Sequence, residues 1–253
     1  MLERRMTSPL TADRVIPLLR SSFGQTYRHY EVCASSQDQL LEGDPEGTIV
    51  VCEEQSAGRG RRGRSWQSPR GRALLASILL RPPPSRTAAE LTLVAGAVTA
   101  ALIEEAIEAP AGIKWPNDVL IDGKKVAGIL AEKRDQGLVL GIGINVNQTS
   151  GELPGGARLD PTSLRIATGR EWDRAELLSD LAYEFEAAYL NWLKDGLSAV
   201  SAALAHRDVL HGRRVRVDAI AGIACGIDTN GALLVDTPAG TRSVVAGEVE
   251  IEW

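Results

Sequence analysis

Runs of apolar residues along the chain predict a sheet that is covered by helices. Residues 48–53 and 73–80 are apolar or β-branched over the length of a strand, as expected of strands that are buried. Thr87 and Glu90 form a capping-box pattern, and residues 91–106 after them are apolar over most of the circumference of a helix. We expect this helix to pack against the sheet as part of the core.

A hairpin and a further strand follow in the middle of the chain. Asp122 and Gly123 separate two strand-like runs, residues 119–121 and 124–132, and Asp-Gly readily adopts the positive φ angles of a tight hairpin turn. After a turn at Gln136-Gly137, another strand is predicted over 138–145.

A long amphipathic helix is predicted between Asp173, which with Glu176 fits a helix start, and Gly196, which ends the helix. Its apolar positions fall on one stripe: Leu178, Leu181, Phe185, Tyr189 and Trp192. This stripe predicts a second helix that belongs to the core.

The first forty residues predict shorter elements. Residues 11–19 have a weak helical pattern that a proline interrupts, and residues 30–34 alternate as a strand does. Ser36 with Gln39 fits a capping box for a short helix that ends at Gly43. On this pattern alone, the serines at positions 35 and 36 could serve only as helix caps.

The pattern changes near residues 206–211 to short β runs with hairpin signals, including Asn230-Gly231. Five short strands in so little sequence predict a small SH3-like β-barrel. We therefore divide the chain into residues 1–207 and residues 208–253.

Four arginines alternate with three glycines over residues 58–64, which we call the arginine segment. Glycine disfavours a regular element and guanidinium groups resist burial, so the arginine segment predicts a mobile surface loop that binds a phosphate or a carboxylate. An RGG-like contact with nucleic acid is the alternative. The net charge of the chain is −5, so the arginine segment is a local positive site, which argues against general nucleic-acid binding.

Composition places the chain among ordinary globular proteins. It has 253 residues, of which 44% are hydrophobic and 24% charged. Its three cysteines, Cys33, Cys52 and Cys225, lack Cys-x-x-Cys spacing, so we expect reduced thiols and neither a disulfide framework nor a zinc site. No apolar run reaches membrane-spanning length and no signal peptide begins the chain, so we expect a cytoplasmic protein.

Two glycine positions indicate a ligand that lies over the sheet. Lys125 precedes an apolar strand in which Gly128 would let a ligand approach the backbone. In residues 141–145, Gly-Ile-Gly-Ile-Asn, glycine on one face leaves room for a ligand while isoleucine on the other packs in the core. Lys125 could equally be a solvated residue at a strand edge.

Four segments, in this order, resemble the motifs of the biotin protein ligases: Gln-Ser-Ala-Gly-Arg-Gly-Arg-Arg-Gly-Arg-Ser-Trp at 55–66, Lys-Trp-Pro-Asn-Asp at 114–118, Lys-Val-Ala-Gly-Ile-Leu at 125–130 and Gly-Ile-Gly-Ile-Asn at 141–145. The resemblance runs from about residue 30 to the end and is to the short form without a winged-helix repressor domain. It implies an α+β fold: a mixed-sheet catalytic domain similar to class II synthetases, with a C-terminal SH3-like barrel.

The resemblance implies ATP, Mg²⁺ and the substrate biotin, and two chemical steps. The biotin carboxylate attacks the α-phosphate of ATP to give biotinyl-5′-AMP, and a lysine of a carrier domain then displaces AMP. In the family the arginine segment is disordered when empty and folds over the intermediate. The partner would be the biotin carboxyl carrier domain of acetyl-CoA carboxylase or another acyl-CoA carboxylase. We expect no DNA or membrane partner, a metal site that is unknown, and a monomer or a weak homodimer.

Carried over by position, the resemblance assigns residues to three roles. The catalytic residues would be Lys125, Arg59 and Arg61. The biotin-binding residues would be Ser35, Ser36, Gln37, Gln55, Gly58, Arg59, Gly60, Arg61, Lys125 and Gly128. The nucleotide-binding residues would be Arg61, Arg64, Trp66, Lys114, Asn117 and Asn145. The family pattern Ser-Thr-Asn is Ser-Ser-Gln here, at residues 35–37, so both hydroxyls remain and the amide is one methylene longer.

Two other functions remain open from the sequence. A related enzyme that transfers lipoyl or octanoyl groups would have no use for the paired serines and Gln55, because an acyl chain has no ureido group. A biotin-sensing repressor or nucleic-acid binder needs a DNA-reading element, which residues 1–30 do not supply.

Overall fold

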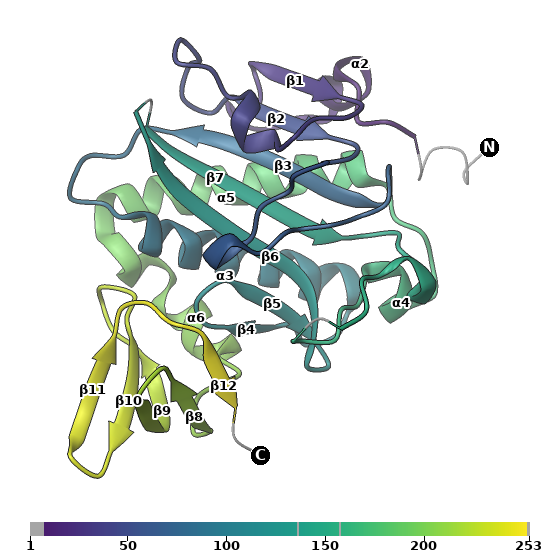
Figure 1. Cartoon of the computed structure of the whole chain (residues 1–253). Coiled ribbons are helices and arrows are strands. Elements are labelled where there is room, and N and C mark those ends of the chain that lie inside the picture. The colour runs from purple at the N-terminus through teal and green to yellow at the C-terminus, as the bar shows by residue number, and fades with distance from the viewer. Residues whose placement is uncertain (1–7, 136, 157, 252–253) are drawn as a thin grey trace.

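A mixed seven-stranded sheet forms the centre of the computed structural model, which describes residues 8–135, 137–156 and 158–251 (Figure 1). The strands are β1 (Tyr27–Tyr30), β2 (Ile49–Cys52), β3 (Ala73–Leu80), β4 (Gly112–Lys114), β5 (Asp118–Ile121), β6 (Lys124–Arg134) and β7 (Gly137–Asn145). Their order is β1-β2-β3-β7-β6-β5-β4. The pair β1–β2 is parallel and the other pairs are antiparallel.

Two long helices, α3 (Ala88–Ile107) and α5 (Arg174–Asp195), cover one face of this sheet (Figure 1). The predicted capping box of α3 is confirmed, because Thr87 accepts a hydrogen bond from the Glu90 amide and Glu90 accepts one from the Thr87 amide. The predicted apolar stripe of α5 is buried in the core. The other face of the sheet is therefore free to carry a site.

Shorter helical segments connect these elements. They are α2 (Ala12–Val15), η1 (Ile16–Leu18), η2 (Ser36–Gln39), η3 (Arg61–Gly63), η4 (Ser150–Glu152), α4 (Leu164–Thr168), η5 (Gly196–Val200) and α6 (Ser201–Arg207). The predicted interruption of the first helix is confirmed, because α2 gives way to the 3₁₀ turn η1 at Pro17. None of the described helices is both long enough and apolar enough to cross a bilayer.

The C-terminal region is a five-stranded antiparallel sheet, as expected, with strand order β11-β10-β9-β8-β12. Its strands are β8 (Arg214–Val217), β9 (Ile220–Ile227), β10 (Leu233–Thr237), β11 (Gly240–Val244) and β12 (Val249–Ile251). Two buried hydrogen bonds join it to the β4 end of the large sheet: Trp115 Nε1 donates to Gly231 O at 2.9 Å, and Lys114 Nζ to Val249 O at 2.8 Å.

Two local predictions near residue 35 are wrong. The strand predicted over 30–34 ends at Tyr30, and the chain then leaves the sheet. The helix expected between Ser36 and Gly43 is only the four-residue 3₁₀ turn η2, which has no capping box. The Ser36 hydroxyl is hydrogen-bonded to Gln55 and Ser77 instead, so a tertiary contact takes the place of the local cap.

The prediction of three reduced cysteines is also wrong. Cys33 and Cys52 form a disulfide, and Cys225 is free and exposed. The parallel pairing of β1 and β2 places Tyr30 opposite Cys52, which brings the chain just after β1 to the end of β2. Cysteine spacing carries no information about this pairing, which only the register of the two strands determines.

Candidate active site

A cavity of about 820 Å³ lies on the sheet face opposite α3 and α5, between the sheet and the arginine segment. It extends across the sheet, from Leu75 and Ala76 of β3 on one side to Lys114 of β4 on the other. Every residue to which the sequence assigned a site role lines it except Gly58. Gly58 is still required nearby, because a Cβ there would lie 2.3 Å from Trp66 O.

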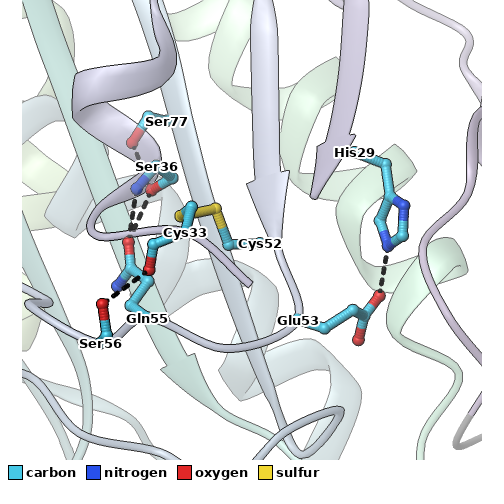
Figure 2. Close-up of a disulfide and its surroundings, with 8 residues drawn as sticks. All are labelled: His29, Cys33, Ser36, Cys52, Glu53, Gln55, Ser56 and Ser77. Atoms are coloured by element: carbon cyan, nitrogen blue, oxygen red, sulfur yellow. Dashed lines mark hydrogen bonds and ion pairs between the residues drawn. A yellow bond between two sulfur atoms is a disulfide. The ribbon is translucent and has the colours of Figure 1, made fainter. Parts of the chain in front are cut away.

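Neutral hydrogen-bonding groups gather around Ser36, at the β3 side of the cavity, and Figure 2 shows Ser36, Gln55 and Ser77 side by side. The backbone amide and hydroxyl of Ser36 lie 2.7 and 3.0 Å from Gln55 Oε1, and the hydroxyls of Ser36 and Ser77 lie 2.8 Å apart. Ser35 lies beside them and is buried. We call Ser35, Ser36, Gln55 and Ser77 the neutral cluster; it can bind a polar, uncharged ring by hydrogen bonds.

Gln37 occupies the space above Gly141 of β7. Its amide Nε2 donates to Leu130 O at 3.2 Å, and a Cβ on Gly141 would lie 2.9 Å from the same nitrogen. The residue that departs from the family pattern therefore contacts the sheet beside the neutral cluster.

Cationic groups gather at the other end of the cavity, which lies over β4, β5 and β6. Arg61, Arg64, Lys114, Lys125 and Arg158 all line it there. Burial lowers the pKa of Lys114, and burial together with the neighbouring charge of Arg62 lowers that of Arg61. Concentrated, partly desolvated positive charge of this kind is suited to a polyphosphate.

Lys125 lies at the centre of this end. Its Nζ is 2.6 Å from Asp118 Oδ1 and 5.4 Å from the centre of the Trp66 ring. Its backbone is held by hydrogen bonds to Asp160 and Thr162, which belong to a segment that crosses the edge of β6. The strand-edge lysine therefore points into the cavity rather than into solvent.

Trp66 packs on the glycines of two strands. A Cβ on Gly128 would lie 2.8 Å from the indole ring, and one on Gly143 would lie 2.7 Å from it. The indole Nε1 is buried and has no hydrogen-bond partner among the described residues. The glycine face predicted from the Gly-Ile alternation thus holds an aromatic ring whose buried N–H has no partner there.

The arginine segment closes on itself over the cavity. Trp66 N donates to Gly58 O at 2.9 Å and Gly60 N to Arg64 O at 2.7 Å, with the turn η3 at the tip. Arg62 and Gly63 both have positive φ angles there. Arg59 points toward the neutral cluster, where its guanidinium contacts both oxygens of Asp38 at 2.8 and 3.2 Å.

Sequence reasoning missed three charged residues of the cavity. Asp118 belongs to the Lys-Trp-Pro-Asn-Asp segment, so its motif could have identified it, whereas Arg158 and Glu248 have no local signal. Glu248 comes from the C-terminal region and pairs with Arg64 and Arg158, each at 2.8 Å. Burial raises the pKa of Glu248, but the hydrogen bond from Arg158 and the nearby cations outweigh burial and leave that pKa below its usual value.

Comparisons with known proteins agree with this geometry. Residues 31–148 match the biotin/lipoate A/B protein ligase family, and residues 210–251 match the biotin protein ligase C terminal domain. The chain is 36% identical over 267 residues to a biotin--[acetyl-CoA-carboxylase] ligase of Mycobacterium tuberculosis, covering 98% of each chain. It is 35% identical over 242 residues to a bifunctional ligase/repressor of Bacillus subtilis, covering 90% of this chain and 74% of the relative.

Among solved structures, the biotin protein ligase of Aquifex aeolicus in complex with biotin and ATP superposes with a TM-score of 0.82 and 30% identity. The match covers 90% of this chain and 99% of that one. Because both regions match family models in order and a relative is matched over nearly its whole length, this chain belongs to the biotin protein ligase family.

Proposed function

We propose that this protein ligates biotin to a lysine of a carrier domain through biotinyl-5′-AMP, at the expense of ATP. One observation carries the proposal: a single cavity has the neutral cluster at one end and five cationic side chains at the other. Biotin has the matching polarity, since its bicyclic ureido ring is neutral and its valeryl chain ends in a carboxylate. ATP supplies the polyanion for the cationic end.

In the first step a biotin carboxylate oxygen forms a bond to the α-phosphorus while the bond to pyrophosphate breaks. Two anions must approach one another, so cations have to neutralise charge on the transferring and departing phosphates. Lys125 lies in the cationic end, where it would bridge the biotin carboxylate and the α-phosphate. From the arginine segment, Arg61 lines the same end, and Arg59, which lies toward the neutral cluster, would meet the carboxylate from that side.

In the second step the amine of a carrier lysine attacks the acyl carbon of biotinyl-5′-AMP. The bond to AMP breaks and the amine loses a proton as the amide forms. The mixed anhydride hydrolyses readily, so the arginine segment has to exclude water until the carrier arrives. Its internal hydrogen bonds would keep the segment together as one unit, and its glycines would let that unit move as a flap over the cavity.

The residues at the cationic end also fit Mg²⁺ held together with the nucleotide. No group of three or more acidic, histidine or cysteine side chains suited to a metal occurs among the described residues. Mg²⁺ commonly uses one or two carboxylates together with substrate phosphates, and Asp118 beside Asn117 in the cavity meets that need. These two residues would hold the ion, which would neutralise phosphate charge.

The remaining assignments complete this proposal. The acceptor is the carrier domain of acetyl-CoA carboxylase or another acyl-CoA carboxylase, and the enzyme acts in the cytoplasm as a monomer or a weak homodimer. The domain boundary lies at residues 207 and 208, where α6 ends. The end of this helix supports that division.

The decisive experiment supplies the protein with ATP, Mg²⁺, labelled biotin and a purified carrier domain. We expect label on the carrier lysine, release of AMP and pyrophosphate, and no label when that lysine is replaced by arginine. Octanoate and lipoate should not inhibit labelling at concentrations at which biotin itself saturates the enzyme, because neither has a ureido group for the neutral cluster. Transfer of octanoate with no transfer of biotin would refute the proposal in favour of a lipoyl-type enzyme.

A further inference from the structure

The disulfide lies directly beside the neutral cluster (Figure 2). Cys33 lies in the turn after β1 and Cys52 is the last residue of β2, with 6.3 Å between their Cα atoms. Both cysteines are buried, and Cys33 keeps a small exposed fraction of 8%. The bond therefore joins the turn after β1 to the last residue of β2.

Each cysteine is followed closely by residues that line the cavity. Ser35 and Ser36 come just after Cys33, and Gln55 comes just after Cys52. The two segments meet again where the Ser36 amide and hydroxyl contact Gln55 Oε1. The disulfide thus fixes the spacing of the two backbones that present the neutral cluster.

Three backbone hydrogen bonds join the same segments beyond the disulfide. Cys33 N donates to Glu54 O at 3.1 Å, Ser56 N to Cys33 O at 2.9 Å, and Ala57 N to Ala34 O at 2.9 Å. Residues 31–35 belong to no strand or helix, and their other polar contacts are an exposed ion pair of Glu31 with Arg70 and two hydrogen bonds, from Asp38 N to Ser35 O and from Ser56 Oγ to Cys33 O. Without the covalent bond, the alignment of Ser36 with Gln55 would rest on a few bonds at the cavity edge.

The cationic end is built on other elements. Lys114, Asp118 and Lys125 belong to β4, β5 and β6, which lie on the far side of β3 and β7 from β2. A change confined to the disulfide should therefore reach the neutral cluster and spare the nucleotide end.

We propose that the Cys33–Cys52 disulfide is a redox-sensitive positioning element for the ureido end of the biotin site, an inference that rests on the proposed function. A dithiol reduces it by thiol exchange: the S–S bond breaks, two cysteine thiols form, and the dithiol is oxidised to its own disulfide. Reduction frees the segment at residues 31–35, misaligns Ser36 and Gln55, and weakens biotin binding. Cys33 keeps an exposed fraction of 8%, which is where a cytosolic dithiol would reach the bond, and the redox state of this pair would then set the affinity for biotin.

The test compares the whole protein in its air-oxidised form and after reduction with dithiothreitol. Maleimide labelling followed by mass spectrometry should count one reactive thiol, Cys225, in the oxidised protein and three after reduction and unfolding. The KM of biotin and the KM of ATP are then measured by pyrophosphate release, with biotin affinity checked by calorimetry. We expect reduction to raise the KM and Kd of biotin about tenfold, the size of one lost hydrogen bond to a ligand, and to leave the KM of ATP within about twofold.

Variants separate this pair from a general effect of the reductant. Cys33→Ser and Cys52→Ser should each have the weak biotin affinity of the reduced protein and no longer respond to dithiothreitol. Cys225→Ser is the matched control, and should keep the wild-type affinity and the full response. If either variant fails to fold by circular dichroism, reduction and reoxidation of the wild-type protein remain the test, and reoxidation should restore the affinity.

Three results would overturn the inference. Equal biotin affinity before and after a verified change in thiol count would make the disulfide a purely structural crosslink. Three reactive thiols in the unfolded, air-oxidised protein would show that the bond does not form. Equal losses of affinity for biotin and for ATP would indicate that reduction loosens the whole catalytic domain rather than the neutral cluster. Absence of biotin binding by the oxidised wild-type protein is a different result, because it would refute the proposed function itself.

Discussion

Lys125 and Asp118 form an ion pair on adjacent strands, with 2.6 Å between Nζ and Oδ1, at the floor of the cavity. Both side chains are partly buried, with exposed fractions of 26% and 16%. The pair holds the ammonium group in the cavity before any anion arrives, so little reorganisation is needed when carboxylate and phosphate bind.

Replacing Lys125 with alanine should leave the fold intact and stop most adenylate synthesis. A partly exposed ion pair contributes about 1 kcal/mol or less to the free energy of unfolding, whereas loss of a preorganised charge in a transition state costs about 100-fold or more in rate. Pyrophosphate release and the melting temperature measure the two effects. Lys124→Ala is the matched control, since Lys124 is exposed on the same strand, and a normal rate for Lys125→Ala would refute the assignment.

Arg59→Gly should separate synthesis of the intermediate from its retention. If Arg59 mainly holds the arginine segment closed, the variant still couples biotin to ATP but releases biotinyl-5′-AMP. Losing one charge-assisted contact of about 1.5–3 kcal/mol corresponds to about 10- to 150-fold faster release. The readout is biotin on a bystander protein such as albumin.

Arg62→Gly is the control for Arg59→Gly. It removes the same charge from the same segment at a position whose φ of 58° glycine adopts without strain. We expect this variant to label albumin far less than Arg59→Gly does, because the ion pair that it removes, to Asp218 at 3.6 Å, joins two exposed side chains. If Arg59→Gly still forms the adenylate but labels albumin no more than the wild-type protein does, the contact that retains the intermediate must come from Arg61 or Lys125.

Gly143→Ala should weaken ATP binding through Trp66. The new methyl group would lie 2.7 Å from indole Cε2, so the ring would have to move away from the cavity floor. We expect the KM of ATP to rise about tenfold, as for the loss of one good contact. Gly151→Ala, where no atom lies within 4 Å of the added carbon, is the control. An unchanged KM in both variants would remove Trp66 from the nucleotide site.

The pH dependence of ATP binding should reflect Lys114. Burial lowers the pKa of Lys114, so its positive charge is lost at a lower pH than that of a surface lysine, and ATP affinity should fall through that range as pH rises. Between the lowered native pKa and the usual one, the unfolded chain binds more protons, so the free energy of unfolding due to this group rises with pH. We therefore expect the affinity for ATP to fall as pH rises, while the free energy of unfolding does not fall.

Calorimetry and denaturant unfolding across the alkaline range give both quantities. Lys114→Arg keeps its charge and should shift the loss of ATP affinity to higher pH. A loss at the same pH in this variant would assign the titration to another group.

The elements with strong local signals were predictable from the sequence. The helix after Thr87, the strand over residues 73–80 and the Asp122-Gly123 turn all appear as expected, because a cap, an apolar run or a positive φ angle fixes each one locally. The alternation of Gly141 and Gly143 with isoleucine also predicted correctly which face of the strand packs in the core, whereas the glycine face is covered by Gln37 and Trp66.

Features that depend on register were beyond the sequence. The turn at Ser36 was misread because its hydroxyl is hydrogen-bonded to Gln55 and Ser77, which lie far away in the chain. The disulfide needed the parallel pairing of β1 with β2, and the position of Glu248 needed the docking of the C-terminal sheet. The cavity residues within motifs could be predicted, whereas those that tertiary structure alone brings together could not.

The arginine segment contacts the C-terminal region through exposed ion pairs, whereas buried hydrogen bonds anchor that region to the large sheet. Arg62–Asp218 and Arg64–Glu248 join partly exposed side chains, whereas the anchoring bonds from Trp115 and Lys114 are buried. Added salt weakens exposed ion pairs far more than it weakens buried hydrogen bonds. Ionic strength is therefore a reversible control that loosens the flap while both sheets stay docked, so leakage of the intermediate should increase with salt before any unfolding is detectable.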